Sequence, residues 1–138
     1  IIIAPSEYYI RLQKGIAGGI IPPTPSLIIQ IGTGDGDSPQ VSITRQSGEE
    51  ETKTVAAADN DALIDELHGI LKEIPTTSPP GSEDIYGLDT GITWMSNDLE
   101  WTNGDNISGQ GKSYVQPSPE EKEKFERAVE IIKEIADV

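Results

Sequence analysis

The chain has 138 residues, the length of one domain, and carries a formal net charge of −14 with no cysteine. The absence of cysteine excludes disulfide bonds, thiol catalysis and thiolate zinc sites. Most of the negative charge lies in residues 59–138; it aids solubility, opposes binding to nucleic acid or an anionic membrane, and favours cationic partners.

Three segments in the first part of the chain alternate apolar and polar residues with the period of a half-buried strand. They lie at residues 8–13, 27–31 and 41–44, and the connectors between them are rich in glycine and proline. Sequential strands with connectors of this length predict an antiparallel meander.

A helix is predicted after these strands, with Asp59 as its N-cap and Pro75 as its stop signal. Its apolar residues recur at helical spacing: Leu63, Ile64, Leu67, Ile70, Leu71 and Ile74. His68, the only histidine, lies on the flank of this stripe. We interpret it as a surface residue of the helix and predict no catalytic role for it.

A β-hairpin and a second helix complete the predicted fold. Residues 92–95 and 99–102 flank Ser-Asn-Asp, so that Trp94 and Trp101 can meet across the hairpin. Residues 118–121 (Ser-Pro-Glu-Glu) form a capping box. The apolar stripe of this helix contains Phe125, Ala128, Val129, Ile132 and Ile135. On its solvated face, Glu residues four positions before Lys124 and Arg127 predict ion pairs within the helix.

The element order βββ-α-ββ-α predicts an α+β fold. We expect a single globular domain over residues 1–138, in which an antiparallel sheet of about four to five strands carries both amphipathic helices on one face. Neither half of the chain has enough apolar residues to form a core alone, and there is no internal repeat.

Residues 73–111 contain seven carboxylates, both tryptophans and no Lys or Arg. This composition predicts a recognition surface over residues 78–105. The candidate binding residues are Glu83, Asp84, Tyr86, Asp89, Trp94, Asp98 and Trp101. The loop carboxylates could instead accept hydrogen bonds from turn amides, or curl around a hard cation. We favour the turn interpretation and predict no metal site and no cofactor.

The chain carries no nucleophile and base at diagnostic spacing, so we predict no catalytic residue. A pair of carboxylates beside a tryptophan is the one enzymatic route left open, as in glycoside hydrolysis.

A second candidate surface is the loop from Gly15 to Ser26, which contains Ile16, Ile20, Ile21 and Pro23. A proline-rich loop loses little entropy when it docks, which suits a partner-binding or proteinase-inhibiting edge. The alternative is that its isoleucines belong to the core.

The location of the protein is predicted from two features. Asn106 begins a glycosylation sequon in a Gly/Asn-rich loop. The chain starts at Ile1 without methionine, which suggests either a processed mature end or an artificially trimmed one. Together they favour secretion, with the cytoplasm as the alternative.

Several segments resemble small, acidic, uncharacterised proteins predicted in fungal genomes. The similar segments are Pro79-Pro80-Gly81-Ser82-Glu83-Asp84-Ile85-Tyr86-Gly87, Asp98-Leu99-Glu100-Trp101, Gly15-Ile16-Ala17-Gly18-Gly19, Pro22-Pro23-Thr24-Pro25-Ser26 and Ala128-Val129-Glu130-Ile131. The resemblance implies a fungal, extracellular source and brings no activity, cofactor or catalytic residue with it.

The sequence therefore favours a non-enzymatic binding protein that uses the acidic, aromatic surface of residues 78–105 on a protein partner, which its charge suggests is basic. Two alternatives stay open. One is a proteinase inhibitor or an accessory small subunit of a larger secreted enzyme. The other is a lectin-like domain that binds carbohydrate through Trp94 and Trp101.

Overall fold

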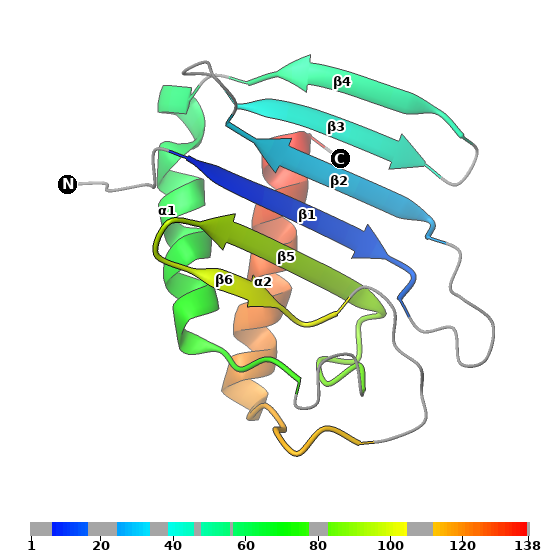
Figure 1. The fold of residues 1–138 in the computed structure, drawn as a ribbon, viewed down its shortest axis with the longest axis vertical. Coiled ribbons are helices and arrows are strands. Elements are labelled where there is room, and N and C mark those ends of the chain that lie inside the picture. Colours follow the sequence, from blue (N-terminus) through cyan, green and yellow to red (C-terminus); the bar gives the residue numbers. More distant parts are fainter. Residues whose placement is uncertain are drawn as a thin grey trace.

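The computed structural model describes residues 7–16, 25–33, 39–45, 48–55, 57–77, 83–104 and 112–137. The elements in chain order are β1 (Tyr8–Lys14), β2 (Leu27–Gly32), β3 (Gln40–Arg45), β4 (Glu50–Thr54), α1 (Ala57–Glu73), β5 (Thr90–Ser96), β6 (Glu100–Thr102) and α2 (Pro119–Ala136). They form two layers, a twisted sheet and a pair of helices behind it (Figure 1). Neither of these helices is long and apolar enough to cross a membrane.

Within the described ranges the sheet has six strands in the order β4-β3-β2-β1-β5-β6, and every neighbouring pair is antiparallel. The predicted α+β class is confirmed. The expected number of strands was too low, because the sequence of β4 does not alternate apolar and polar residues. That strand reads Glu-Glu-Thr-Lys-Thr and has no apolar residue to alternate. It can form a strand because it lies at the edge of the sheet, and the Gly48 amide, at a residue with φ 89°, donates a hydrogen bond to the Arg45 carbonyl at the end of β3.

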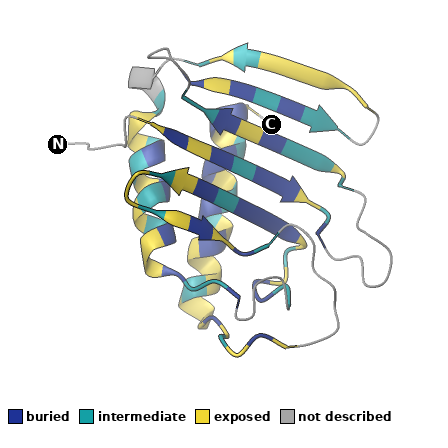
Figure 2. Cartoon of the chain, in the orientation of Figure 1, coloured by how far each residue is buried: buried dark blue, intermediate teal, exposed yellow. Residues whose placement is uncertain are grey.

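The core lies between the sheet and the helices, as predicted (Figure 2). Every second residue of the central strands faces the helices and is buried: Tyr8, Ile10, Leu12, Ile29, Ile31, Val41, Ile43, Ile92 and Trp94. The helices supply Ile64, Leu67, Leu71, Phe125, Ala128, Ile131, Ile132 and Ile135. Leu63, Ile70 and Val129 are only partly buried, because they lie at the margins of the two stripes.

The start of α2 is confirmed as a capping box. Ser118 Oγ accepts a hydrogen bond from the Glu121 amide at 3.2 Å, and Glu121 Oε1 accepts one from the Ser118 amide at 2.8 Å. Asp137 ends the helix in the left-handed conformation, with φ 59°. The predicted N-cap of the other helix was wrong, because α1 begins at Ala57 and so includes Asp59.

Lys124 and Arg127 of α2 pair with glutamates of α1 and not with the predicted glutamates four positions earlier, and Arg127 also lies within 4.0 Å of Glu130 and Glu134 of its own helix. Lys124 Nζ lies 2.7 Å from Glu73 Oε2, and Arg127 Nε lies 2.7 Å from Glu66 Oε2. Because α1 and α2 pack side by side, the acidic flank of α1 comes within reach of these cations (Figure 1). The hydrogen bond from Arg127 lowers the pKa of Glu66.

Candidate functional site

The carboxylate of Glu83 holds the segment that leads into α2. Its Oε1 atom accepts hydrogen bonds from the Ser113 amide at 2.9 Å and from Gln116 Nε2 at 3.1 Å. These bonds join two segments that are 30 residues or more apart in the sequence. Glu83 therefore has a structural role.

The other two loop carboxylates also accept main-chain hydrogen bonds. Asp84 accepts from the amides of Gly87 at 3.2 Å and Asp89 at 2.9 Å. Asp89 accepts from the amide of Ile16 at 2.9 Å, and its own backbone is left-handed, with φ 53°. This is the geometry of the turn interpretation. Within the described ranges, no group of three or more His, Cys, Asp or Glu side chains is placed to hold a metal ion.

The three aromatic residues of the predicted surface are buried. Tyr86 stacks on Phe125 with ring centroids 4.1 Å apart, and its hydroxyl donates to the Pro75 carbonyl. Burial raises the pKa of that hydroxyl. Trp101 Nε1 donates to the Ile74 carbonyl at 3.0 Å, and Trp94 faces the helices. A platform for stacking sugars needs an exposed ring face, and neither tryptophan offers one.

Asp98 connects the β5–β6 hairpin to α1. Its Oδ2 atom lies 2.9 Å from His68 Nε2 and 3.0 Å from Lys72 Nζ. Its Oδ1 atom accepts a hydrogen bond from Ser96 Oγ at 2.8 Å. These bonds, the one from Ser96 first and then the one from Lys72, lower the pKa of Asp98 to about 2. The carboxylate is therefore ionised at neutral pH.

His68 is less exposed than the sequence predicted. Its side chain is 11% exposed, and the ring lies 5.2 Å from the Trp94 ring, centroid to centroid. The Nε2 atom faces Asp98 and not the Ser96 hydroxyl, which donates to the same carboxylate. A carboxylate with a pKa of about 2 is a weak base. The cluster thus has the geometry of a structural link and not of an activated serine.

The second candidate surface falls largely outside the described residues. Ile16 is fully buried, which agrees with the alternative that it belongs to the core. Ile20, Ile21 and Pro23 lie outside the described ranges, and so does the sequon residue Asn106.

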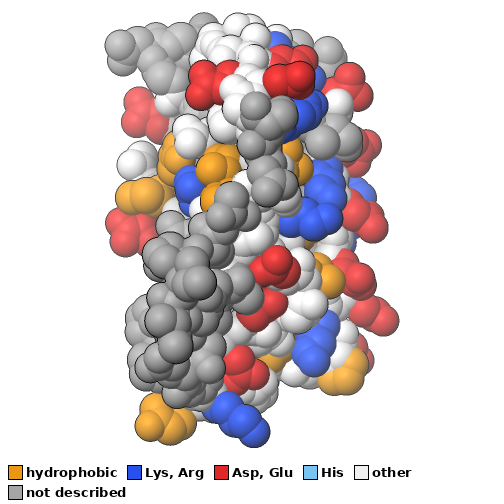
Figure 3. All heavy atoms as spheres, turned by 90° about the vertical axis from the view of Figure 1, so that its right-hand side faces the viewer, with side chains coloured by type: hydrophobic (Ala, Val, Ile, Leu, Met, Phe, Trp, Pro, Cys, Tyr) orange, Lys and Arg blue, Asp and Glu red, His pale blue; other side chains and the backbone are white. Residues whose placement is uncertain are grey.

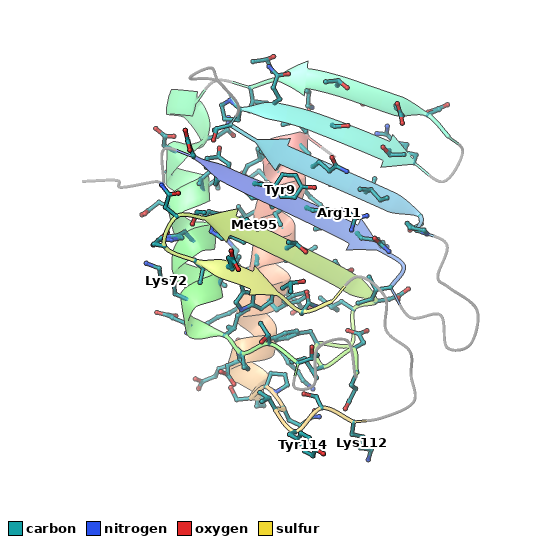
Figure 4. The ribbon with its side chains drawn as sticks, in the orientation of Figure 1. Tyr9, Arg11, Lys72, Met95, Lys112 and Tyr114 are labelled. Carbon is teal, nitrogen blue, oxygen red and sulfur yellow. The ribbon has the colours of Figure 1, made fainter. Side chains whose placement is uncertain are left out.

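The uncovered face of the sheet, opposite the helices, carries exposed apolar side chains. Tyr9 of β1 and Met95 of β5 are directly paired in the register, and they are 36% and 47% exposed. Arg11 follows Tyr9 on the same face of β1. Figure 4 places Tyr9, Arg11 and Met95 near the middle of the sheet. An exposed aromatic beside a methionine is typical of interaction surfaces.

Shallow depressions lie on both sides of Tyr9. One, of about 370 Å³, has Gln30, Ser42 and Thr52 in its lining. The other, of about 290 Å³, extends toward Met95 and Glu100. Polar side chains that can donate and accept hydrogen bonds therefore surround the exposed apolar pair.

Sequence reasoning missed this surface although the signal was present. The alternation that places Tyr8 and Trp94 in the core places Tyr9 and Met95 on the opposite face. Since both helices were expected on one side of the sheet, the other side had to be exposed. The acidic composition of residues 73–111 favoured the loop as the binding surface instead.

Comparisons of this chain with protein-family models, with curated proteins and with solved structures find no match.

Proposed function

We propose that this chain is a non-enzymatic binding protein that contacts a protein partner through the uncovered face of its sheet. The observation that carries the proposal is the exposed pair of Tyr9 and Met95 in the middle of that face. The face includes part of the segment first expected to bind, because Met95 and Glu100 belong to residues 78–105. The buried tryptophans and the engaged loop carboxylates are excluded from it.

The chemistry of the face suits a protein ligand. Tyrosine offers a large, rigid contact surface that loses little side-chain entropy. Methionine adapts its shape to the surface that it meets. Gln30, Gln40 and Ser42 supply hydrogen-bonding groups beside the apolar pair. The net charge of −14 favours a partner with a basic surface, since attraction at long range speeds association.

The test is affinity purification from the native source, followed by mass spectrometry. A Tyr9→Ala/Met95→Ala variant removes the apolar pair, and Tyr114→Ala is the matched control. Tyr114 is 88% exposed and lies in the segment before α2, far from Tyr9 (Figure 4). We expect one stoichiometric partner to be retained by the wild-type protein and by the control but lost by the double variant. A partner retained equally by all three proteins would contradict the proposal.

A further inference from the structure

Among the residues that the structure describes, strand β4 is an edge of the sheet, and β3 is its only strand neighbour there (Figure 1). Two main-chain hydrogen bonds between β3 and β4 show which main-chain groups of β4 point to β3. The Arg45 amide donates to the Glu49 carbonyl, and the Val55 amide donates to the Pro39 carbonyl. Hydrogen-bonded residues alternate along an antiparallel pair. The amides and carbonyls of Glu51 and Lys53 therefore point to β3.

The main-chain groups of Glu50, Thr52 and Thr54 point away from the sheet by the same alternation. No hydrogen bond from these three amides is found within the described part of the chain. A strand with such a row of unused donors and acceptors can pair with another strand. The charges on the side chains of β4 then decide which strand fits beside it.

The side chains of β4 carry opposite charges two residues apart. Glu51 and Lys53 lie on the helix side of the strand, and Thr52 lies between them on the uncovered face. Glu51 Oε2 is 3.5 Å from Arg45 Nη1. Lys53 is half-buried and has no acidic partner among the described residues. Figure 3 shows acidic and basic side chains close together at the end of the molecule where Figure 1 places β4.

We propose that β4 pairs with β4 of a second copy of this chain, antiparallel about a two-fold axis at Thr52. Each Thr52 then lies opposite the other, and the outward groups of Glu50, Thr52 and Thr54 form about six main-chain hydrogen bonds. Glu51 of each copy lies opposite Lys53 of the other on the same face. Two ion pairs form, and the two sheets become continuous.

The charges select this register over its neighbours. A two-fold axis at Lys53 would place the two lysines opposite each other, and an axis at Glu51 would place the two glutamates opposite each other. A cationic peptide from another protein would meet Lys53. The strand is therefore complementary to itself in one register, and this argues for a second copy as the occupant.

The dimer leaves the uncovered face accessible. Thr52 lines the depression of about 370 Å³ beside Tyr9, so pairing at Thr52 brings the two depressions toward each other across the axis. The interface is small, and each copy has a net charge of −14, so the two copies repel each other at long range. We expect a weak dimer that dissociates on dilution.

Sedimentation velocity over about a hundredfold range of concentration tests the pairing, because mass action makes a weak dimer depend on concentration. The wild-type protein should dimerise, and Glu51→Lys and Lys53→Glu should each remain monomeric. An equimolar mixture of the two variants should dimerise again, because one copy then presents two lysines to two glutamates. Circular dichroism confirms that each variant is folded. A monomeric wild-type protein, dimeric single variants or a monomeric mixture would each overturn the proposal.

A cross-linking experiment tests the register without changing charge. The chain has no cysteine, so Thr52→Cys introduces a single thiol. In the proposed dimer the two Cα atoms lie about 5.5 Å apart, within disulfide range. Thr102→Cys, on the opposite edge strand β6, is the control. We expect Thr52→Cys to form the disulfide-linked dimer more than about tenfold faster than the control. Equal rates would contradict the register. Dimerisation should persist in Tyr9→Ala/Met95→Ala, which separates this test from that of partner binding.

Discussion

His68 Nε2 lies 2.9 Å from Asp98 Oδ2, and this contact joins α1 to the β5–β6 hairpin. The histidine ring also packs over Trp94, a fully buried residue of β5. The connection thus has a polar part at the surface and an apolar part beneath it. Lys72 and Ser96 complete the polar part by bonding the same carboxylate.

Asp98→Asn should lower stability in a pH-dependent way. The carboxyl pKa falls from its usual 3.8 to about 2 in the folded protein, because Ser96 and Lys72 favour the charged form. Because the carboxyl has a lower pKa in the folded state than in the unfolded state, its charge stabilises the protein at every pH above the pKa of the unfolded state. This contribution is lost as the pH falls through the pKa of the folded state. The difference in urea midpoint between wild type and variant should be present at about pH 5 and shrink between about pH 4 and about pH 2.

Fluorescence of the buried tryptophans can follow this unfolding. The matched control is Glu100→Gln, which removes an exposed carboxylate of the same hairpin that has no ion pair among the described residues. It should unfold like the wild-type protein at every pH. A midpoint difference for Asp98→Asn that stays constant down to about pH 2 would show that its charge does not stabilise the fold.

Ile132→Ala should cost about 2–5 kcal/mol of unfolding free energy, through lost transfer energy and the cavity that remains. Ile132 is fully buried between α2 and the sheet. Domains of this size are stable by only about 5–15 kcal/mol, so the loss is a large fraction. Urea unfolding measures it, and Glu126→Ala on the exposed face of α2 is the control. A loss under about 1 kcal/mol would show that Ile132 is not a core residue.

The fold was predictable where periodicity is strong and less so at the edge of the sheet. Tyr8, Ile10 and Leu12 alternate because their strand is covered on one face only. The α2 stripe and its capping box could be identified for the same kind of reason. An edge strand such as β4 needs no apolar face, so Glu50–Thr54 carried no pattern. Its pairing depends on the turn at Gly48 and on β3.

The candidate site was predicted less well, because the composition of a segment does not show which of its side chains face the core and which face the solvent. Trp94 and Trp101 were expected at a surface, and both are buried. The partner of His68 is Asp98, 30 residues away, and only the packing of α1 against the hairpin brings them together. The turn interpretation of Asp84 and Asp89 was accessible from the sequence, because both residues lie in a short loop with glycines.

Gly91→Ala and Gly69→Ala should have opposite effects on stability. A Cβ atom at Gly91 would lie 2.0 Å from the Gly104 carbonyl oxygen, so the backbone of one segment would have to move. We expect a loss of about 3 kcal/mol or more. Gly69 lies on the exposed face of α1, and apart from the backbone of its own helix no atom of the described residues lies within 4 Å of its Cβ position. There the same change should stabilise the helix by about 0.5–1 kcal/mol.

Thermal and urea unfolding measure both variants under the same conditions. A stability loss in Gly69→Ala would mean that its face of α1 is covered by a neighbouring segment. A neutral Gly91→Ala would mean that β5 and the segment after β6 can separate at little cost.

Millimolar Ca²⁺ should leave the melting temperature nearly unchanged relative to EDTA. Asp84 and Asp89 accept hydrogen bonds from backbone amides, and Glu83 holds the segment before α2. A cation would have to replace these bonds, because the lone pairs that it needs face amide hydrogens.

Differential scanning calorimetry with and without Ca²⁺ measures the shift, and Asp84→Asn shows whether a shift comes from this loop. Binding to the folded state at a hundredfold excess over Kd would stabilise by about 2.7 kcal/mol. For a chain of this length that is a rise of roughly 10 °C. Such a rise, lost in Asp84→Asn, would mean that the loop is a metal site and that the amide bonds are secondary.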